Sequence, residues 1–230
     1  MPAKPVSLRH PLVRALIALT FTTGLVDAIS YLGLGRVFTA NMTGNVVLLG
    51  FGIAGGTGLP VLAPIISLGA FLLGSAAGGQ LAVRVADRHP VHIARALAIE
   101  VGLVSASAVI AAAATIRPGG FAADLLIALL ALAMGVRNAT VRRLGVPDLS
   151  TTVLTMTLTG LAADSPLGGG AGEGSARRLA AVVAMLAGAL AGALLLQTSL
   201  VLPLLLTAAL GLLTWLVYVP AARRNLGSGG

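Results

Sequence analysis

Two acidic residues, Asp27 and Glu100, lie inside long apolar stretches of this 230-residue sequence. A charged group is costly inside a bilayer, so such a residue usually faces a cavity or a partner. Glu100 lies about ten residues into its stretch, and a rise of about 1.5 Å per residue places it near the bilayer centre. Either carboxyl could carry a coupling proton. Alternatively, each could be neutral or hydrogen-bonded to a neighbouring helix.

A cluster of small polar residues, Asn41-Met-Thr43-Gly44-Asn45, follows the first apolar stretch. Asn41 or Thr43 can cap a helix that starts there, and Gly44 permits a tight turn. If this segment enters the membrane and leaves on the same side, the free N–H groups of the helix N-terminus would attract an anionic or polar ligand. The alternative is that Asp27 satisfies those N–H groups and that nothing binds there.

The composition indicates an integral membrane protein. Hydrophobic residues make up 57% of the chain and charged residues 10%, with a mean hydropathy of +0.99, whereas a soluble domain has about 25% charged residues. The net charge is +8, but the basic residues lie at the ends of apolar stretches. We therefore expect contact with the lipid bilayer and no nucleic acid partner. The chain has no cysteine and no recognisable catalytic motif, so we expect no metal, no cofactor and no enzymatic activity.

Six apolar stretches are long enough to cross about 30 Å of hydrocarbon as helices. They cover residues 12–32, 60–83, 91–116, 121–141, 179–196 and 200–219. Two further segments, residues 38–56 and 149–164, are shorter and rich in Thr, Asn and Gly. These two segments either cross the membrane, which gives eight spans, or are re-entrant or partial, which gives six.

The distribution of basic residues favours six spans. With six spans and a cytoplasmic N-terminus, all of the 15 Lys and Arg residues except Arg36 and Arg117 are assigned to the cytoplasmic side. With eight spans, only about half of the basic residues would lie on the cytoplasmic side, and the usual excess of cytoplasmic positive charge would be absent. We therefore predict an all-α membrane protein of the bacterial inner membrane, with six spans, two re-entrant or partial segments, and both termini in the cytoplasm.

The two halves of the chain resemble each other weakly, which suggests duplication. Short motifs recur in the same order at offsets near half the chain length: Gly24…Asp27-Ala28 and Gly135…Asn138-Ala139, Thr43-Gly44 and Thr159-Gly160, Gly74/Gly78 and Gly188/Gly192. Each half, residues 12–116 and 121–219, would hold three spans, and an odd number of spans reverses the second half. We therefore predict one membrane domain (1–230) built as an inverted repeat, the layout of many secondary transporters.

Two glycine-rich segments lie outside the predicted spans. Residues 168–174 are typical of a flexible linker, here on the cytoplasmic side, and residues 225–230 of a loose tail.

Residues 24–31 and 38–45, which contain the motifs around Asp27 and Asn45, resemble the YoaK-type family of small multi-pass bacterial membrane proteins of unknown function. The resemblance extends across nearly the whole chain, through Asn138-Ala139 and Thr159-Gly160. It implies the membrane class and supplies no mechanism. Arg137 departs from the pattern, because a neutral polar residue is expected beside Asn138, and this puts a ligand role of that turn in doubt.

These observations favour a transporter or channel for a small polar or anionic solute, with its site between the two halves. The expected lining residues are Asp27, Asn41, Thr43, Gly44, Asn45, Asn138, Thr159 and Gly160, with Asp27 or Glu100 carrying a coupling proton. The alternative is a non-transporting subunit that assists assembly or binds a partner, in which the polar cluster serves folding only. A homo-oligomer is compatible with either function.

The six-span topology makes a direct prediction for the segment between the second and third spans. A reporter enzyme fused between Arg84 and Arg95 should show the activity of a cytoplasmic fusion, because three basic residues of this segment hold it on that side. Paired reporters that are active on opposite sides of the membrane measure this. A periplasmic signal from the segment would contradict the inverted arrangement.

Overall fold

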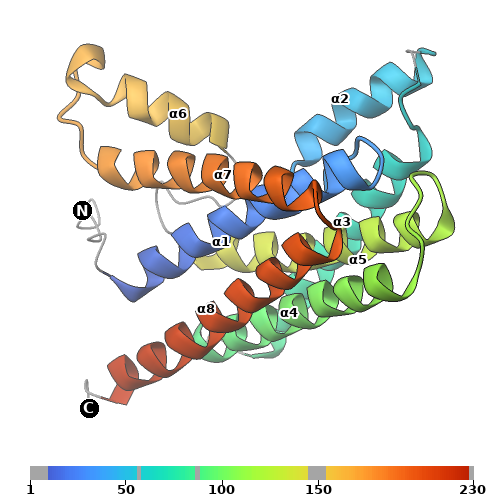
Figure 1. The fold of residues 1–230 in the computed structure, drawn as a ribbon. Coiled ribbons are helices and arrows are strands. Elements are labelled where there is room, and N and C mark those ends of the chain that lie inside the picture. Colours follow the sequence, from blue (N-terminus) through green and yellow to red (C-terminus); the bar gives the residue numbers. More distant parts are fainter. Residues whose placement is uncertain (1–9, 56–57, 86–88, 145–153, 228–230) are drawn as a thin grey trace.

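The computed structural model describes residues 10–55, 58–85, 89–144 and 154–227, and every regular element among them is a helix (Figure 1). The helices are α1 (Pro11–Ala28), continued by the π-helix η1 (Ile29–Gly33), α2 (Met42–Ile53), α3 (Leu62–Arg84), α4 (His89–Ala113), α5 (Phe121–Leu144), α6 (Leu154–Ala163), the 3₁₀ helix η2 (Pro166–Gly168), α7 (Ser175–Leu196) and α8 (Val201–Gly227).

Six helices are long and apolar enough to cross a membrane, namely α1 with η1, α3, α4, α5, α7 and α8. The other two apolar helices, α2 and α6, have 12 and 10 residues. At about 1.5 Å per residue they extend about 18 and 15 Å, well short of the hydrocarbon thickness. The predicted all-α membrane fold of six spans and two shorter segments is therefore confirmed. Residues 149–153 of the second short segment lie outside the described part of the chain.

The helices α1 and α5 form the centre of the bundle. Buried residues make up 67% and 56% of the spanning parts of these helices, compared with 17% for α7. The largest core cluster is built mainly on α5, where Leu126, Ile127, Leu130 and Met134 are fully buried. The apolar side chains of α7 lie mostly exposed on the outside, as expected for a helix that contacts lipid.

Glycines allow two pairs of helices to pack with their backbones in contact. On α3, a Cβ atom at Gly74 would overlap the carbonyl of Leu132 on α5. On α7, a Cβ atom at Gly188 would overlap the carbonyl of Phe21 on α1. Small residues are the usual means of close helix approach in membranes, where lipid removes the hydrophobic drive for association.

These two helix pairs make equivalent contacts, and each pair joins one helix of residues 12–116 to one helix of residues 121–219. A Cβ atom added at Gly78 of α3 would lie 2.9 Å from the Cβ atom of Ala139 on α5, and one added at Gly192 of α7 would lie 2.8 Å from the Cβ atom of Ala28 on α1. Other helix pairs correspond in the same way: α4 packs on α5 as α8 packs on α1, and α2 packs on α3 as α6 packs on α7. The two short helices project from opposite ends of the bundle (Figure 1).

The glycine-rich segment after α6 forms a hydrogen-bonded turn, which differs from the expected flexible linker. Gly170 N–H donates to Ser165 O at 3.0 Å, and Gly172 N–H donates to Asp164 O at 2.8 Å. The glycines close the turn because a Cβ atom at Gly168 or Gly170 would overlap backbone carbonyls. Of the expected tail, residues 225–227 belong to α8, and residues 228–230 lie outside the described part of the chain.

The close helix contacts predict which glycines of α3 can change. Gly74→Ala should lower the thermal unfolding midpoint in detergent, because its methyl group must push α5 away, at a cost of about 1–3 kcal/mol. Gly188→Ala should have a similar effect on α7. The matched control is Gly79→Ala, since a Cβ atom at Gly79 has nothing within 4 Å and alanine is the better helix former. Equal midpoints for Gly74→Ala and Gly79→Ala would contradict the packing.

Candidate functional site

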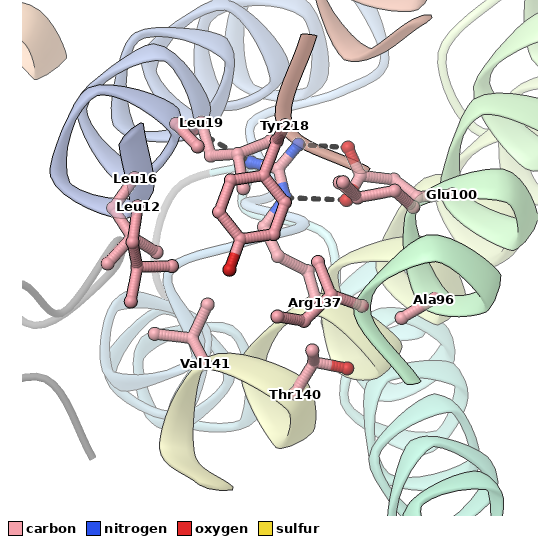
Figure 2. Close-up of a pocket in the computed structure, with 12 residues that line it drawn as sticks. Leu12, Leu16, Leu19, Ala96, Glu100, Arg137, Thr140, Val141 and Tyr218 are labelled. Atoms are coloured by element: carbon pink, nitrogen blue, oxygen red, sulfur yellow. Dashed lines mark hydrogen bonds and ion pairs between the residues drawn. The ribbon is translucent and has the colours of Figure 1, made fainter. Parts of the chain in front are cut away.

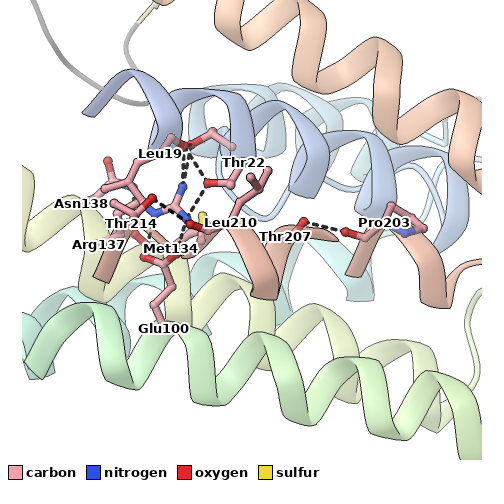
Figure 3. Close-up of polar contacts among 11 residues, drawn as sticks. Leu19, Thr22, Glu100, Met134, Arg137, Asn138, Pro203, Thr207, Leu210 and Thr214 are labelled. Carbon is pink, nitrogen blue, oxygen red and sulfur yellow. Dashed lines mark hydrogen bonds and ion pairs between the residues drawn. The ribbon is translucent and has the colours of Figure 1, made fainter. Parts of the chain in front are cut away.

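A buried ion pair joins Glu100 of α4 to Arg137 of α5 near the middle of the bundle (Figure 3). Arg137 Nε donates to Glu100 Oε2 at 2.8 Å, and Arg137 Nη2 donates to Glu100 Oε1. Each residue is 2% exposed. Both belong to spanning segments, so the pair lies at membrane depth, where an ionised group needs a partner.

Arg137 also binds α1, and this uses the rest of its hydrogen-bonding capacity. Its Nη1 donates to the carbonyl of Leu19 and to Thr23 Oγ1, and its Nη2 donates to Thr22 Oγ1, all at 2.9 Å. The two threonine hydroxyls donate to Leu19 O, which leaves their oxygens free to accept. A guanidinium has five N–H donors, and these contacts account for all five.

The position of Arg137 corrects one assignment made from the sequence. The charge distribution placed Arg137 among the cytoplasmic residues, but its side chain lies inside the span Phe121–Arg143. An arginine within two turns of a helix end can extend to the surface, so sequence alone does not separate the two positions. Its partner Glu100 comes from another helix, which also explains why no polar neighbours of Glu100 are visible in the sequence.

A small cavity lies beside the ion pair (Figure 2). Its volume is about 20 Å³, which is room for one water molecule. Glu100 and Arg137 line it together with apolar side chains from α1 and α4 and with Tyr218 of α8. Thr140, in the same wall, has its hydroxyl 3.5 Å from His92 Nε2. The surface that lines the cavity is apolar, because the polar atoms of Glu100 and Arg137 are bonded to each other and to α1.

Asp27 holds the chain between η1 and α2. Its Oδ1 accepts a hydrogen bond from the N–H of Ala40 at 3.1 Å, and the N–H groups of Thr39 and Asn41 also bond to this carboxyl. Asn41 then caps α2, because its side-chain oxygen accepts from Gly44 N at 3.2 Å. The predicted cap is thus Asn41, whereas Thr43 is exposed.

Asn45 completes this network by joining the same loop to α3. It accepts from the N–H of Phe38 at 2.9 Å and donates to the Phe38 carbonyl at 2.6 Å and to Ser67 Oγ at 3.0 Å. Gly44 lies in α2 and makes no tight turn; its hydrogen faces the Phe38 ring, which a Cβ atom would approach at 2.8 Å. Asp27, Asn41, Gly44 and Asn45 therefore form one structural unit. Its polar groups bond to the protein itself, as the non-binding alternative requires.

The predicted residues of the second half lie elsewhere. Asn138 donates to the carbonyl of Met134 on its own helix. Thr159 is exposed on α6 and donates to Thr155 O, while Gly160 O accepts from Arg178 of α7 at 2.6 Å. Arg178 also pairs with Asp164 at 2.7 Å, so it fastens α6 to α7. Because α2 and α6 lie at opposite ends of the bundle (Figure 1), Thr159 and Gly160 are separated from the residues around Asp27, and Asn138 lies apart from both on α5.

Most other buried polar side chains of the bundle are hydrogen-bonded, some of them between helices: Ser75 of α3 donates to the carbonyl of Gly135 on α5 at 3.3 Å, and Trp215 of α8 donates to that of Ala94 on α4 at 2.9 Å. The part of the chain that the structure describes contains no group of three metal-ligating side chains. On α8, the buried hydroxyls of Thr207 and Thr214 donate to the carbonyls of Pro203 and Leu210 at 2.7 and 2.8 Å (Figure 3). Thr39 is an exception, because its buried hydroxyl lacks a partner. The ion pair is thus the charged centre of the described bundle.

Comparison with known proteins agrees with this fold. The family described as "Protein of unknown function (DUF1275)" matches residues 15–218, which is most of the chain. The chain belongs to this family. It is also similar to the UPF0700 transmembrane protein YoaK of Bacillus subtilis (strain 168), with 35% identity over 147 residues. That match covers 64% of this chain and 64% of the relative's length. No solved structure matches the chain.

The ion pair predicts strong coupling between Glu100 and Arg137 in stability. Glu100→Leu or Arg137→Met should each lower the free energy of unfolding by about 3–5 kcal/mol, because each leaves a buried charge without its partner. The double variant should cost clearly less than the two single changes together, and chemical unfolding in detergent measures this double-mutant cycle. The exposed Glu173 provides the control, and Glu173→Leu should change little. Additive costs would show that the pair is not coupled.

Proposed function

We propose that this polytopic membrane protein is a transporter for a small polar or anionic solute, and that its two halves are an inverted repeat. The observation that carries the proposal is that corresponding helices of the two halves make equivalent contacts: α3 packs on α5 as α7 packs on α1. Repeats of this kind are common in secondary transporters, which bind their substrate near the bilayer midplane between the repeats. The proposed activity is movement of a solute rather than enzymatic catalysis.

The order of the helices supports inversion. Each half contributes three long helices and one short one, and an odd number of crossings reverses the second half in the membrane. The opposite placement of α2 and α6 in Figure 1 is what this arrangement requires. With the basic residues on the cytoplasmic side, both termini would face the cytoplasm of a bacterium, and the protein would lie in its inner membrane.

Two cavities outline a route for the solute. The small cavity beside Glu100 lies among α1, α4, α5 and α8. A second cavity of about 310 Å³ lies toward the other ends of α1, α4 and α8, where Gly33, Ala111 and Leu200 line it. Along α4, Glu100 is the lining residue of the small cavity nearest to Ala111 of the second one, and Arg137 of α5 is bonded to it. In this proposal the ion pair separates the two ends of a closed route, and Glu100 or Asp27 carries the coupling proton.

The alternative function is a non-transporting subunit that assists assembly or binds a partner. One observation favours it, because Asp27, Asn41 and Asn45 are hydrogen-bonded within the protein in the way that a purely structural cluster would be. In the transport proposal the same unit has a different role. It fixes α2 and the end of α1 at one mouth of the route, and a homo-oligomer is compatible with both functions.

Reconstitution tests the proposal. Purified protein in proteoliposomes should take up at least one labelled solute from a panel of formate, sulfate, phosphate, succinate and glycine about tenfold faster than protein-free vesicles. Asp27→Asn and Asn45→Ala should reduce that rate strongly, because both loosen the loop at the mouth of the route. Glu173→Gln is the matched control and should keep the full rate.

The other outcomes are equally informative. Background flux for every solute of the panel would favour the non-transporting subunit. Full rates in both Asp27→Asn and Asn45→Ala would remove these two residues from the transport mechanism, while leaving transport itself established.

A further inference from the structure

We propose that Arg137 is a binding residue for a carboxylate or similar oxyanion, and that the Glu100 carboxylate occupies its place in the closed state. Protonation of Glu100 would then release the guanidinium for the anion. This inference rests on the proposed transport function and names both its substrate class and its coupling group. The contacts of Arg137, the adjacent cavity and the charges around it carry the argument.

The contacts of Arg137 divide into a fixed set and an exchangeable set. Three N–H donors bind Leu19 O, Thr22 and Thr23, which belong to the backbone or short side chains of α1. The other two form a fork on the two oxygens of Glu100. Such a fork matches any carboxylate, and the α1 contacts hold the guanidinium in position whatever occupies it.

Protonation changes the charge balance of the pair. The proton bonds to a carboxyl oxygen of Glu100 and makes that group neutral, while arginine keeps its charge under all ordinary conditions. An unpartnered guanidinium at this depth is strongly unfavourable, so an anion that enters with the proton replaces the lost charge. The site thus takes up one proton and one monovalent anion together, and its net charge stays the same.

The surroundings of the pair favour an anion over a cation. The titratable groups near it are Asp27 of α1, which interacts electrostatically with Arg137, His92 of α4 and Tyr218 of α8. The carboxyl of Asp27 already accepts backbone N–H groups of residues 39–41. Once Glu100 is neutral, Arg137 remains as the charged member of the pair. Its positive charge would repel any positively charged solute.

Access to the pair comes from the small cavity. Glu100 and Arg137 both line it, and its volume of about 20 Å³ admits one water molecule but no carboxylate. The lining of the cavity is apolar, so a proton and an anion both reach the pair only when the wall of Leu16, Leu97 and Tyr218 moves apart. One opening would therefore admit both, as their uptake together requires.

The single tryptophan of the chain provides a probe for this exchange. Trp215 packs against the cluster of Leu19, Ile93, Leu97 and Tyr218, whose members line the cavity. Its Nε1 donates to the carbonyl of Ala94 at 2.9 Å. Movement of the cavity wall would therefore change the fluorescence of Trp215.

The experiment is a titration of purified protein in detergent with sodium formate, with sodium chloride at equal ionic strength as the reference. Glu100→Gln mimics the protonated carboxyl. At about pH 7.5 we expect it to show a saturable change in Trp215 fluorescence and a rise in unfolding midpoint on the order of 5 °C at saturation. The double variant Glu100→Gln/Arg137→Met should show neither change. Equal responses of the single and the double variant would overturn the proposal.

The wild-type protein gives a second test that does not depend on the folding of a variant. Formate stays ionised between about pH 7.5 and 5.5, and over this range its apparent affinity should rise at least tenfold, because the site takes up one proton with each anion. An affinity independent of pH would overturn the proposal. Binding is measured without vesicles, so saturable formate binding together with background flux would sustain the anion site and refute transport. Wild-type uptake by Arg137→Met would sustain transport and refute the anion site.

Discussion

The guanidinium of Arg137 has five N–H groups, and in the interior of a membrane bundle each of them must find an acceptor. Two acceptors come from Glu100 on α4 and three from α1, while Arg137 itself belongs to α5. The need to satisfy one side chain therefore fixes the relative positions of three helices from both halves of the chain. Any movement of α1 against α4 must break hydrogen bonds to Arg137 or supply new ones.

The glycine contacts fix the packing of the helices next to the ion pair. They bring α1 onto α7 and α3 onto α5 at backbone distance, so that two tight pairs flank the ion pair. Small residues at these contacts let the helix backbones approach closely. The bundle thus combines a charged centre that permits few arrangements with flanking pairs that leave no room for an added methyl group.

The sequence predicts the spans well, because about 20 apolar residues in a row have few alternatives to a membrane helix. It also predicts that Asn41 can cap α2, since capping is a local interaction. It does not predict that Glu100 pairs with Arg137, or that Asn45 reaches Ser67 on α3, because these contacts depend on how separate helices pack. The local signals at the centre are the acidic Glu100 inside an apolar stretch and the departure of Arg137 from the family pattern. The sequence also does not show that Asn138 lies on α5 and that Thr159 and Gly160 lie on α6, away from the loop that Asp27 holds, because this too depends on helix packing.

The π-helix η1 at the end of α1 has a consequence for the evolution of chain length. A π-helical turn holds one more residue than an α-helical turn, and here it lies directly between Asp27 and the loop that Asp27 holds. A deletion of one residue within Ile29–Gly33 would restore ordinary α-helical bonding and rotate everything that follows by about 100°. Ala40 would then no longer meet the carboxyl of Asp27. The number of residues in this segment is therefore constrained as strictly as their identity, and insertions or deletions should be rarer here than in the neighbouring loops.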